Sequence, residues 1–156
     1  MLKFRAAVGF LILFSAFSLI IVFLLSFKTY PDGVLINNKL FVVEVADSVK
    51  LQEKGLSGHT PLLDNEGMLF VFNNPGEYGI WMKDMFFSID IIWINENYRV
   101  VHTEEAVSPK TYPKVFYPGT NSLYVLELAS GQINKAKIKN GDLVEFVKNS
   151  QRKLDF

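Results

Sequence analysis

The chain opens with an apolar segment, residues 6–27, that contains no charged residue. As a helix rising about 1.5 Å per residue it would span roughly 33 Å, enough for a bilayer core of about 30 Å. Lys3 and Arg5 precede this segment, whereas only Lys28 follows it closely. The positive charge on the N-terminal side predicts a single-pass signal anchor in the cell membrane, with a cytoplasmic N-terminus and an extracytoplasmic C-terminal domain.

A cleaved signal peptide is the alternative interpretation of this segment. Ala16-Phe17-Ser18 has the small residues at alternate positions that signal peptidase requires. Cleavage there would leave the apolar sequence LIIVFLLSF as the new N-terminus, and no second pair of small residues occurs near residues 27–30. The pattern therefore favours an uncleaved anchor, and the lipid bilayer is the expected partner of residues 6–27.

Beyond residue 38, most apolar positions alternate with polar ones or form short runs of strand length, which is typical of β-strands. Strands are expected at 40–45, 68–72, 78–82, 87–94, 98–103, 122–128 and 143–147. Short helices are expected at 49–54, capped by Asp47-Ser48 and ended by Gly55, and at 132–137, capped by Ser130. This order predicts a β-rich α+β domain, a compact antiparallel barrel or sandwich of about seven short strands with two short helices.

Turn signals and changes in composition along the chain predict its domain organisation. Residues 1–28 form the cytoplasmic stub and transmembrane anchor, and 29–38 form a linker marked by the turn signals Pro31-Asp32-Gly33 and Asn37-Asn38. Residues 39–148 form the β-rich domain, and 149–156 form a polar tail.

The segment 79–94, GIWMKDMFFSIDIIWI, is almost as apolar as a membrane span, yet it contains Lys83, Asp84 and Asp90. We expect two strands joined at Lys83-Asp84, the second of them central, because both of its faces are apolar. Asp90 would then be buried, where an unpaired charge costs several kcal/mol. We therefore expect it to bond Lys83, Arg99 or the backbone amides of residues 81–84.

Composition excludes several classes of function. The 16 basic residues balance the 16 acidic ones, so the charge pattern gives no support for nucleic-acid binding. The chain has no cysteine, which excludes disulfides, thiolate metal sites and cysteine nucleophiles. The two histidines, His59 and His102, lack metal-ligand spacing, and no Walker, Rossmann or Gly-x-Ser-x-Gly motif occurs. We therefore predict neither a metal site nor a cofactor.

Four stretches of the chain resemble the domain-of-unknown-function 192 family over about residues 38–147. They are EVADSVKLQEKGLSGH, GMLFVF, IWMKDMFFSIDIIWI and LYVLELASGQINKAKIKNGDLVEF. The resemblance implies a β-rich domain, often exported or membrane-anchored in prokaryotes, without an agreed activity. Members often read Trp-Met-Lys-Asn-Thr where this chain has WMKDM at 81–85, and Arg where it has His59. A site built from those positions would therefore be altered in this chain.

Aromatic and acidic residues supply the candidates for a site. The Pro-rich segment 106–121 keeps Tyr112 and Tyr117, and such loops often lie where ligands enter. Asp90 and Glu127 are acids on apolar strands, and they could form a catalytic acid pair or be structural. The candidate ligand-binding residues are Trp81, Lys83, Asp90, Tyr112, Tyr117, Glu127 and His59.

These patterns predict a membrane-tethered extracytoplasmic module that binds a ligand or partner at the cell envelope without catalysis. The main alternative is an envelope hydrolase that uses Asp90 and Glu127 as its acid pair. A purely structural partner of another membrane protein is the third possibility.

Overall fold

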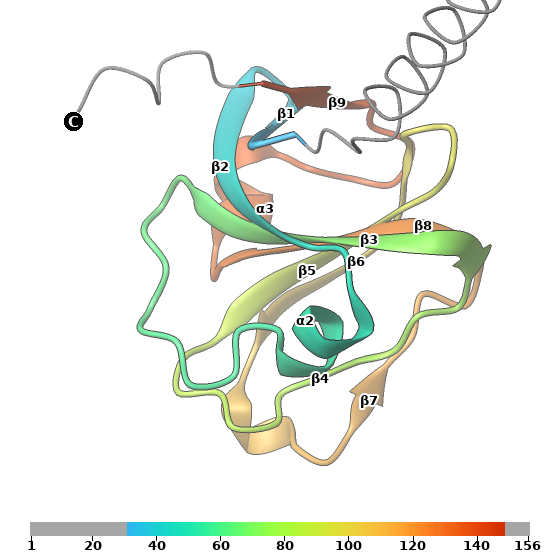
Figure 1. Ribbon diagram of the computed structural model, residues 1–156. Coiled ribbons are helices and arrows are strands. Elements are labelled where there is room, and N and C mark those ends of the chain that lie inside the picture. The colour runs from blue at the N-terminus through green and yellow to red at the C-terminus, as the bar shows by residue number, and fades with distance from the viewer. Residues whose placement is uncertain (1–30, 149–156) are drawn as a thin grey trace, which may run out of the picture. The chain divides into compact units, whose positions relative to one another are not determined.

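The computed structural model describes residues 31–148, and Figure 1 shows this part of the chain in colour. The predicted anchor at 6–27, the stub before it and the tail at 149–156 lie outside the described residues. Within 31–148, none of the helices has both the length and the apolar character that a membrane span needs. The predicted anchor thus stays a prediction from the sequence.

Strands dominate the described chain. In order, the elements are β1 (Gly33–Ile36), β2 (Lys39–Ala46), α2 (Val49–Lys54), β3 (Glu66–Gly76), β4 (Ile80–Trp81), β5 (Ile89–Ile94), β6 (Val100–Val107), the 3-10 helix η1 (Pro109–Thr111), β7 (Val115–Phe116), β8 (Ser122–Ala129), α3 (Gln132–Ala136) and β9 (Val144–Val147). The prediction of a β-rich domain with two short helices is confirmed.

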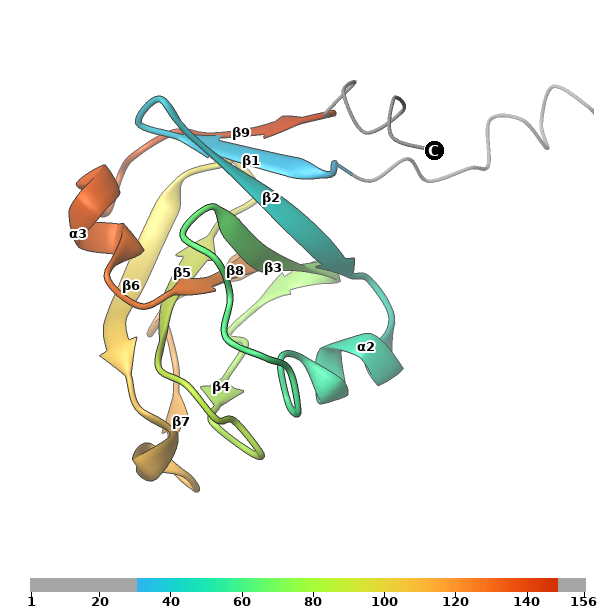
Figure 2. The same cartoon turned by 90° about the vertical axis from the view of Figure 1, so that its left-hand side faces the viewer.

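Seven strands form one curled sheet, a half-barrel, in the order β6-β5-β8-β3-β2-β1-β9 (Figures 1 and 2). Its edges meet at one end, where Arg99 and Leu143 form an antiparallel bridge just before β6 and β9. All neighbours are antiparallel except β2 and β3, which are parallel. The prediction of a purely antiparallel sheet is wrong for the pair β2–β3. These strands are parallel because α2 and the loop after it carry the chain back to the starting end of β2.

The expected linker at 29–38 contains β1. Ile36 lies opposite Lys39 in an antiparallel hairpin with β2, so only two residues form the turn. Both of them, Asn37 and Asn38, have positive φ angles of 49° and 63°. Two-residue turns of this kind suit the twist of paired strands, and asparagine tolerates them well. Asn37-Asn38 is therefore the turn of a hairpin within the sheet, and it does not belong to a linker.

The two strands expected at 78–82 and 87–94 are present as β4 and β5, but they do not pair with each other. β4 pairs instead with β7, where Trp81 lies opposite Val115, in a separate two-stranded sheet. β5 lies between β6 and β8 in the main sheet. The loop at 106–121, expected to lack regular structure, contributes η1 and β7, and it thereby supplies the partner that residues 80–81 need.

Two smaller differences concern turns and caps. The sequence Asn73-Asn74-Pro75-Gly76 predicts a turn after the strand at 68–72, but β3 continues through it, with an irregularity in its pairing to β8 between Val71 and Gly76. Gly131 rather than Ser130 is the N-cap of α3, and it has a left-handed backbone and no side-chain cap. The first turn of α3 therefore needs acceptors from elsewhere in the chain.

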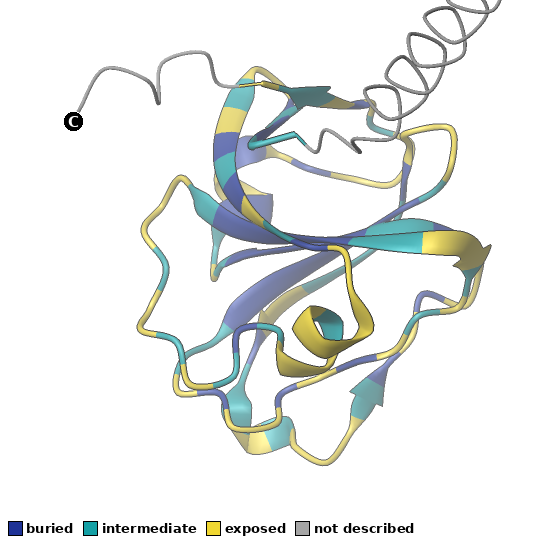
Figure 3. Ribbon diagram, in the orientation of Figure 1, coloured by how far each residue is buried: buried dark blue, intermediate teal, exposed yellow. Residues whose placement is uncertain are grey.

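The core consists of two clusters, one on each face of the sheet, and Figure 3 shows the buried positions along the strands. The first, the α3-side core, includes Leu126, Leu128 and Ile133. The second, the α2-side core, includes Met68, Phe70, Ile80, Met85 and Ile91. Every residue of β5 is buried, so the prediction that this strand is central is confirmed.

Candidate functional site

Asp90 is fully buried, as predicted, but its partners differ from those expected. Its Oδ1 accepts a hydrogen bond of 2.8 Å from the Ala106 amide, and its Oδ2 accepts one of 2.8 Å from the Ile133 amide. Neither Lys83, Arg99 nor the amides of 81–84 contribute. Ala106 has a positive φ of 49°, and Ile133 is in the first turn of α3. Asp90 therefore replaces the missing cap of α3 and fixes the irregular end of β6.

Glu127 lies on the strand next to Asp90 but enters the other face of the sheet. In the β5–β8 register, Asp90 is opposite Leu128, and Glu127 is opposite Ile91. Side chains alternate between faces along a strand, so Asp90 belongs to the α3-side core and Glu127 to the α2-side core. The two carboxyl groups therefore cannot face each other across one cleft, as an acid pair would require.

Glu127 is only 4% exposed, and its Oε2 has no hydrogen-bond partner among the described residues. This burial raises the pKa of Glu127 to about 8. The charged form is disfavoured because the apolar surroundings cannot replace its hydration. At neutral pH the group is therefore mainly the uncharged acid, which can donate a hydrogen bond.

A pocket of about 50 Å³ reaches Glu127 from the surface. It lies between the end of α2, the loop after it, β3 and β4. Apolar side chains form much of its wall, namely Leu56, Phe70, Ile80 and Met85. Trp81 also lines it and is 47% exposed. The α2 side of the pocket is polar, with Gln52, Glu53, Lys54 and Ser57 in its wall, so Glu127 meets a recess that has both an apolar and a polar side.

Exposed aromatic side chains gather beside this pocket, and we call Trp81, Tyr112 and Tyr117 the aromatic rim. The rings of Trp81 and Tyr112 meet edge-on, with their centroids 6.0 Å apart. Lys83 places its Nζ 5.6 Å from the centroid of the Trp81 ring. This distance suits a cation–π contact and brings a positive charge to the rim.

Gly79 lets Tyr117 lie close to the wall of the pocket. A Cβ added at Gly79 would lie 2.5 Å from Cε1 of Tyr117 and 2.6 Å from Cγ1 of Val115. Real Cβ atoms do not approach other atoms so closely, so β4 and β7 can pair at this spacing only because residue 79 has no side chain.

The loop after α2 holds the turn that carries Lys83. The Ser57 hydroxyl donates to the carbonyl of Lys83 at 2.8 Å, and the Gly58 amide donates to the carbonyl of Asp84 at 3.1 Å. Asp84 itself has a positive φ of 54°. These bonds fix the position of the turn between β4 and β5 relative to the pocket.

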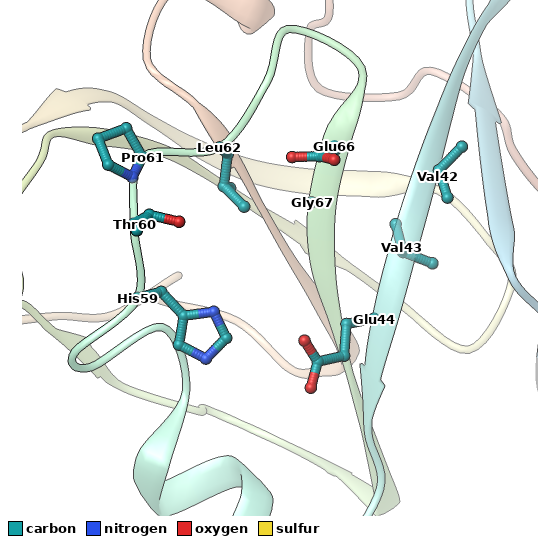
Figure 4. Close-up of a pocket in the computed structure, with 9 residues that line it drawn as sticks. All are labelled: Val42, Val43, Glu44, His59, Thr60, Pro61, Leu62, Glu66 and Gly67. Atoms are coloured by element: carbon teal, nitrogen blue, oxygen red, sulfur yellow. The ribbon is translucent and has the colours of Figure 1, made fainter.

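His59 lines a different pocket, of about 380 Å³, between the loop after α2 and the parallel pair β2–β3. Figure 4 shows it facing Glu44 across the opening, with Glu66 nearby. The Oε2 of Glu66 accepts a bond of 2.9 Å from the Leu63 amide, which gives this carboxylate a role in the loop. Across residues 31–148, no cluster of three or more potential His, Cys, Asp or Glu ligands could hold a metal ion.

The structure thus brings together Trp81, Lys83, Tyr112, Tyr117 and Glu127, and it places His59 and Asp90 elsewhere. Sequence reasoning missed Gly79, Leu56 and Met85 as parts of the same site. Gly79 alone carried a signal, since a glycine beside a short strand often marks a close approach of two segments.

Comparison with known proteins places the chain in a family. The family described as DUF192, "Uncharacterized ACR", matches residues 34–146. The protein belongs to the DUF192 family. This match includes the strands that carry Trp81 and Glu127, so the candidate site lies within the family domain.

Two solved structures resemble this DUF192 protein. A protein of unknown function from Novosphingobium aromaticivorans has 30% sequence identity and a TM-score of 0.69, over 73% of this chain and 84% of that one. A putative transcription regulator from Sinorhizobium meliloti has 24% identity and a TM-score of 0.69, over 78% of this chain and 98% of that one. The second likeness concerns the fold alone. Among curated proteins, none matches this chain.

Proposed function

We propose that this DUF192 domain binds a small ligand at the cell envelope, without catalysis, through the aromatic rim and the Glu127 pocket. The observation that carries the proposal is the buried Oε2 of Glu127, which has no partner among the described residues. An unsatisfied buried polar group costs about 1–3 kcal/mol. A ligand that supplies the missing partner recovers this free energy on binding.

The rim supplies the second part of a binding site. Trp81, Tyr112 and Tyr117 are 47%, 47% and 56% exposed. Large aromatic rings beside a recess offer apolar contact area at low entropic cost, and Lys83 adds a charged donor. The predicted anchor at residues 6–27 supports a location at the membrane surface.

The geometry favours binding over the hydrolase alternative. Carboxylate hydrolases such as most glycosidases use two acids about 5–10 Å apart on either side of the scissile bond. Asp90 and Glu127 enter opposite faces of the sheet, and Asp90 uses both of its oxygens to hold backbone amides. A single acid in the wall of a small pocket suits ligand recognition better than two-carboxylate hydrolysis.

A thermal-shift screen tests the proposal on the full-length chain. The protein is kept in a polyoxyethylene detergent, which contains no sugar and retains the predicted anchor in solution. The panel contains sugars, peptidoglycan fragments and lipids. We expect at least one compound to raise the melting temperature of the wild-type protein.

Two aromatic variants locate the binding. The shift should disappear in Trp81→Ala and persist in Phe86→Ala, because Phe86 is 75% exposed and is not part of the pocket wall. A shift that survives Trp81→Ala would contradict the site. Turnover of a bound compound that is lost in Glu127→Gln would favour an enzyme instead.

A further inference from the structure

The size of the Glu127 pocket limits what can enter it. Its volume is about 50 Å³. A cavity needs roughly 10–15 Å³ on the same kind of measure to hold one water molecule. The recess therefore accepts a group of a few heavy atoms, such as a short acyl group, and excludes a six-membered ring.

The wall of the pocket selects the chemistry of that group. Leu56, Phe70 and Met85 form the apolar side of the wall, which suits a methyl group, whereas Gln52, Glu53, Lys54 and Ser57 form its polar side. Glu127 presents one polar group without a protein partner among residues 31–148. A methyl group and a hydrogen-bonding atom must therefore sit close together in the guest.

The protonation state of Glu127 decides which hydrogen-bonding atom fits. The neutral acid donates a proton, so it requires an acceptor. The other titratable groups that line the pocket are Glu53 and Lys54, both exposed on α2, whereas β3 and β4 contribute none. A carboxylate guest would bring its charge into the same surroundings that keep Glu127 neutral, whereas an uncharged carbonyl oxygen would not.

We infer that the Glu127 pocket takes an N-acetyl group, carried by a sugar ring that stacks on the aromatic rim. This inference rests on the proposed function and gives its ligand class. The acetyl methyl contacts Leu56, Phe70 and Met85, and the acetyl carbonyl accepts a hydrogen bond from Glu127. The sugar ring stays outside against Trp81.

An acetylated lysine side chain could present the same group, and the rim favours the sugar. A lysine stem is a thin aliphatic chain that needs a narrow channel. The rim is an open surface of half-exposed rings, and flat apolar faces of sugars contact such rings well. Lys83 lies beside Trp81, where it can donate to sugar hydroxyls.

Calorimetric titration of the full-length protein in polyoxyethylene detergent tests the inference. The probes are N-acetylglucosamine, glucosamine, glucose and N-acetyl-lysine methyl ester. We expect N-acetylglucosamine to bind about 10-fold or more tightly than glucose or glucosamine, the gain of one buried hydrogen bond and a buried methyl group. Equal affinity for glucose, or tighter binding of the lysine ester, would overturn the inference.

Variants at Glu127 connect the preference to this side chain. Glu127→Leu should abolish the preference for the acetylated sugar, whereas Glu127→Gln should keep it, because the amide also donates. Between about pH 6 and pH 9 the wild-type affinity should fall and that of Glu127→Gln should stay constant. A preference that persists in Glu127→Leu would contradict the assignment of the acetyl group to this pocket.

The two proposals fail in different ways. If some other compound binds in a Trp81-dependent manner and N-acetyl sugars show no preference, the inference is wrong and the proposed function stands. If no compound in the panel requires Trp81, the proposed function is wrong as well.

Discussion

Asp90 holds Ile133 in place through a hydrogen bond of 2.8 Å from the Ile133 amide to its Oδ2. The two residues are 43 positions apart, and the bond ties β5 at the centre of the sheet to the first turn of α3. Because Gly131 offers no side-chain cap, Asp90 is the group that satisfies this amide. The carboxyl group of Asp90 thus has a structural role in an otherwise apolar strand.

The first prediction concerns the loss of this carboxylate. Asp90→Ala should lower the free energy of unfolding by about 2–4 kcal/mol, because it leaves the buried amides of Ala106 and Ile133 without acceptors. Asp90→Asn keeps one acceptor and should cost less. Chemical denaturation measures both changes, and a stability unaffected by Asp90→Ala would refute the structural role.

The second prediction concerns the pH dependence of stability. Burial raises the pKa of Glu127 from 4.5 to about 8 in the folded protein. The stability contributed by the neutral acid is therefore complete below the unfolded pKa of 4.5 and is lost as pH rises through the folded pKa of about 8. Within this window the expected loss is roughly 1 kcal/mol per pH unit.

Glu127→Gln isolates this effect, because glutamine has a similar shape and does not titrate. The stability of this variant should fall less steeply between about pH 5 and pH 8 than that of the wild-type protein. Denaturation curves at several pH values provide the comparison. Parallel profiles for the two proteins would show that Glu127 does not titrate as its burial indicates.

The third prediction concerns Gly79. Gly79→Ala introduces a Cβ that overlaps Tyr117 and Val115, so β4 and β7 must separate. We expect a loss of about 1–3 kcal/mol in stability, typical of overpacking, together with weaker binding at the aromatic rim. Adding Tyr117→Ala to this variant should restore part of the stability. A double variant no more stable than Gly79→Ala alone would argue against this packing.

The fourth prediction concerns membrane topology. Residues 6–27 should span the membrane once, with residues 1–5 in the cytoplasm and the DUF192 domain outside. Protease added to intact spheroplasts should then remove a C-terminal tag. Complete protection of the tag, with digestion after lysis as the control, would contradict the predicted orientation.

Local signals in the sequence predicted local structure well. The bounds of α2, its cap Ser48 and its end at Gly55 agree with the structure, because each depends on residues within one or two turns. The burial of Asp90 followed from the apolar residues on either side of it. These features required no knowledge of how distant segments pair.

Features that depend on strand pairing could not be predicted from the sequence. The faces that Asp90 and Glu127 enter depend on the register of β5 and β8, which are separated by β6 and the loop at 106–121. The partners of Asp90 lie 16 and 43 residues away. The grouping of Trp81 with Tyr112 likewise depends on the β4–β7 pair, whose strands have only two residues each.

The four methionines of the chain can serve as NMR probes for a ligand in the Glu127 pocket. Met85 lines the Glu127 pocket, Met68 lies opposite Glu127 in the β3–β8 register, and Met82 is in the same core. Met1 lies in the predicted cytoplasmic stub and serves as the control. With methyl-labelled methionine, a titration with N-acetylglucosamine should shift the Met85 signal progressively and leave that of Met1 unchanged. Saturable binding that leaves the Met85 signal unmoved would contradict a ligand site at Glu127.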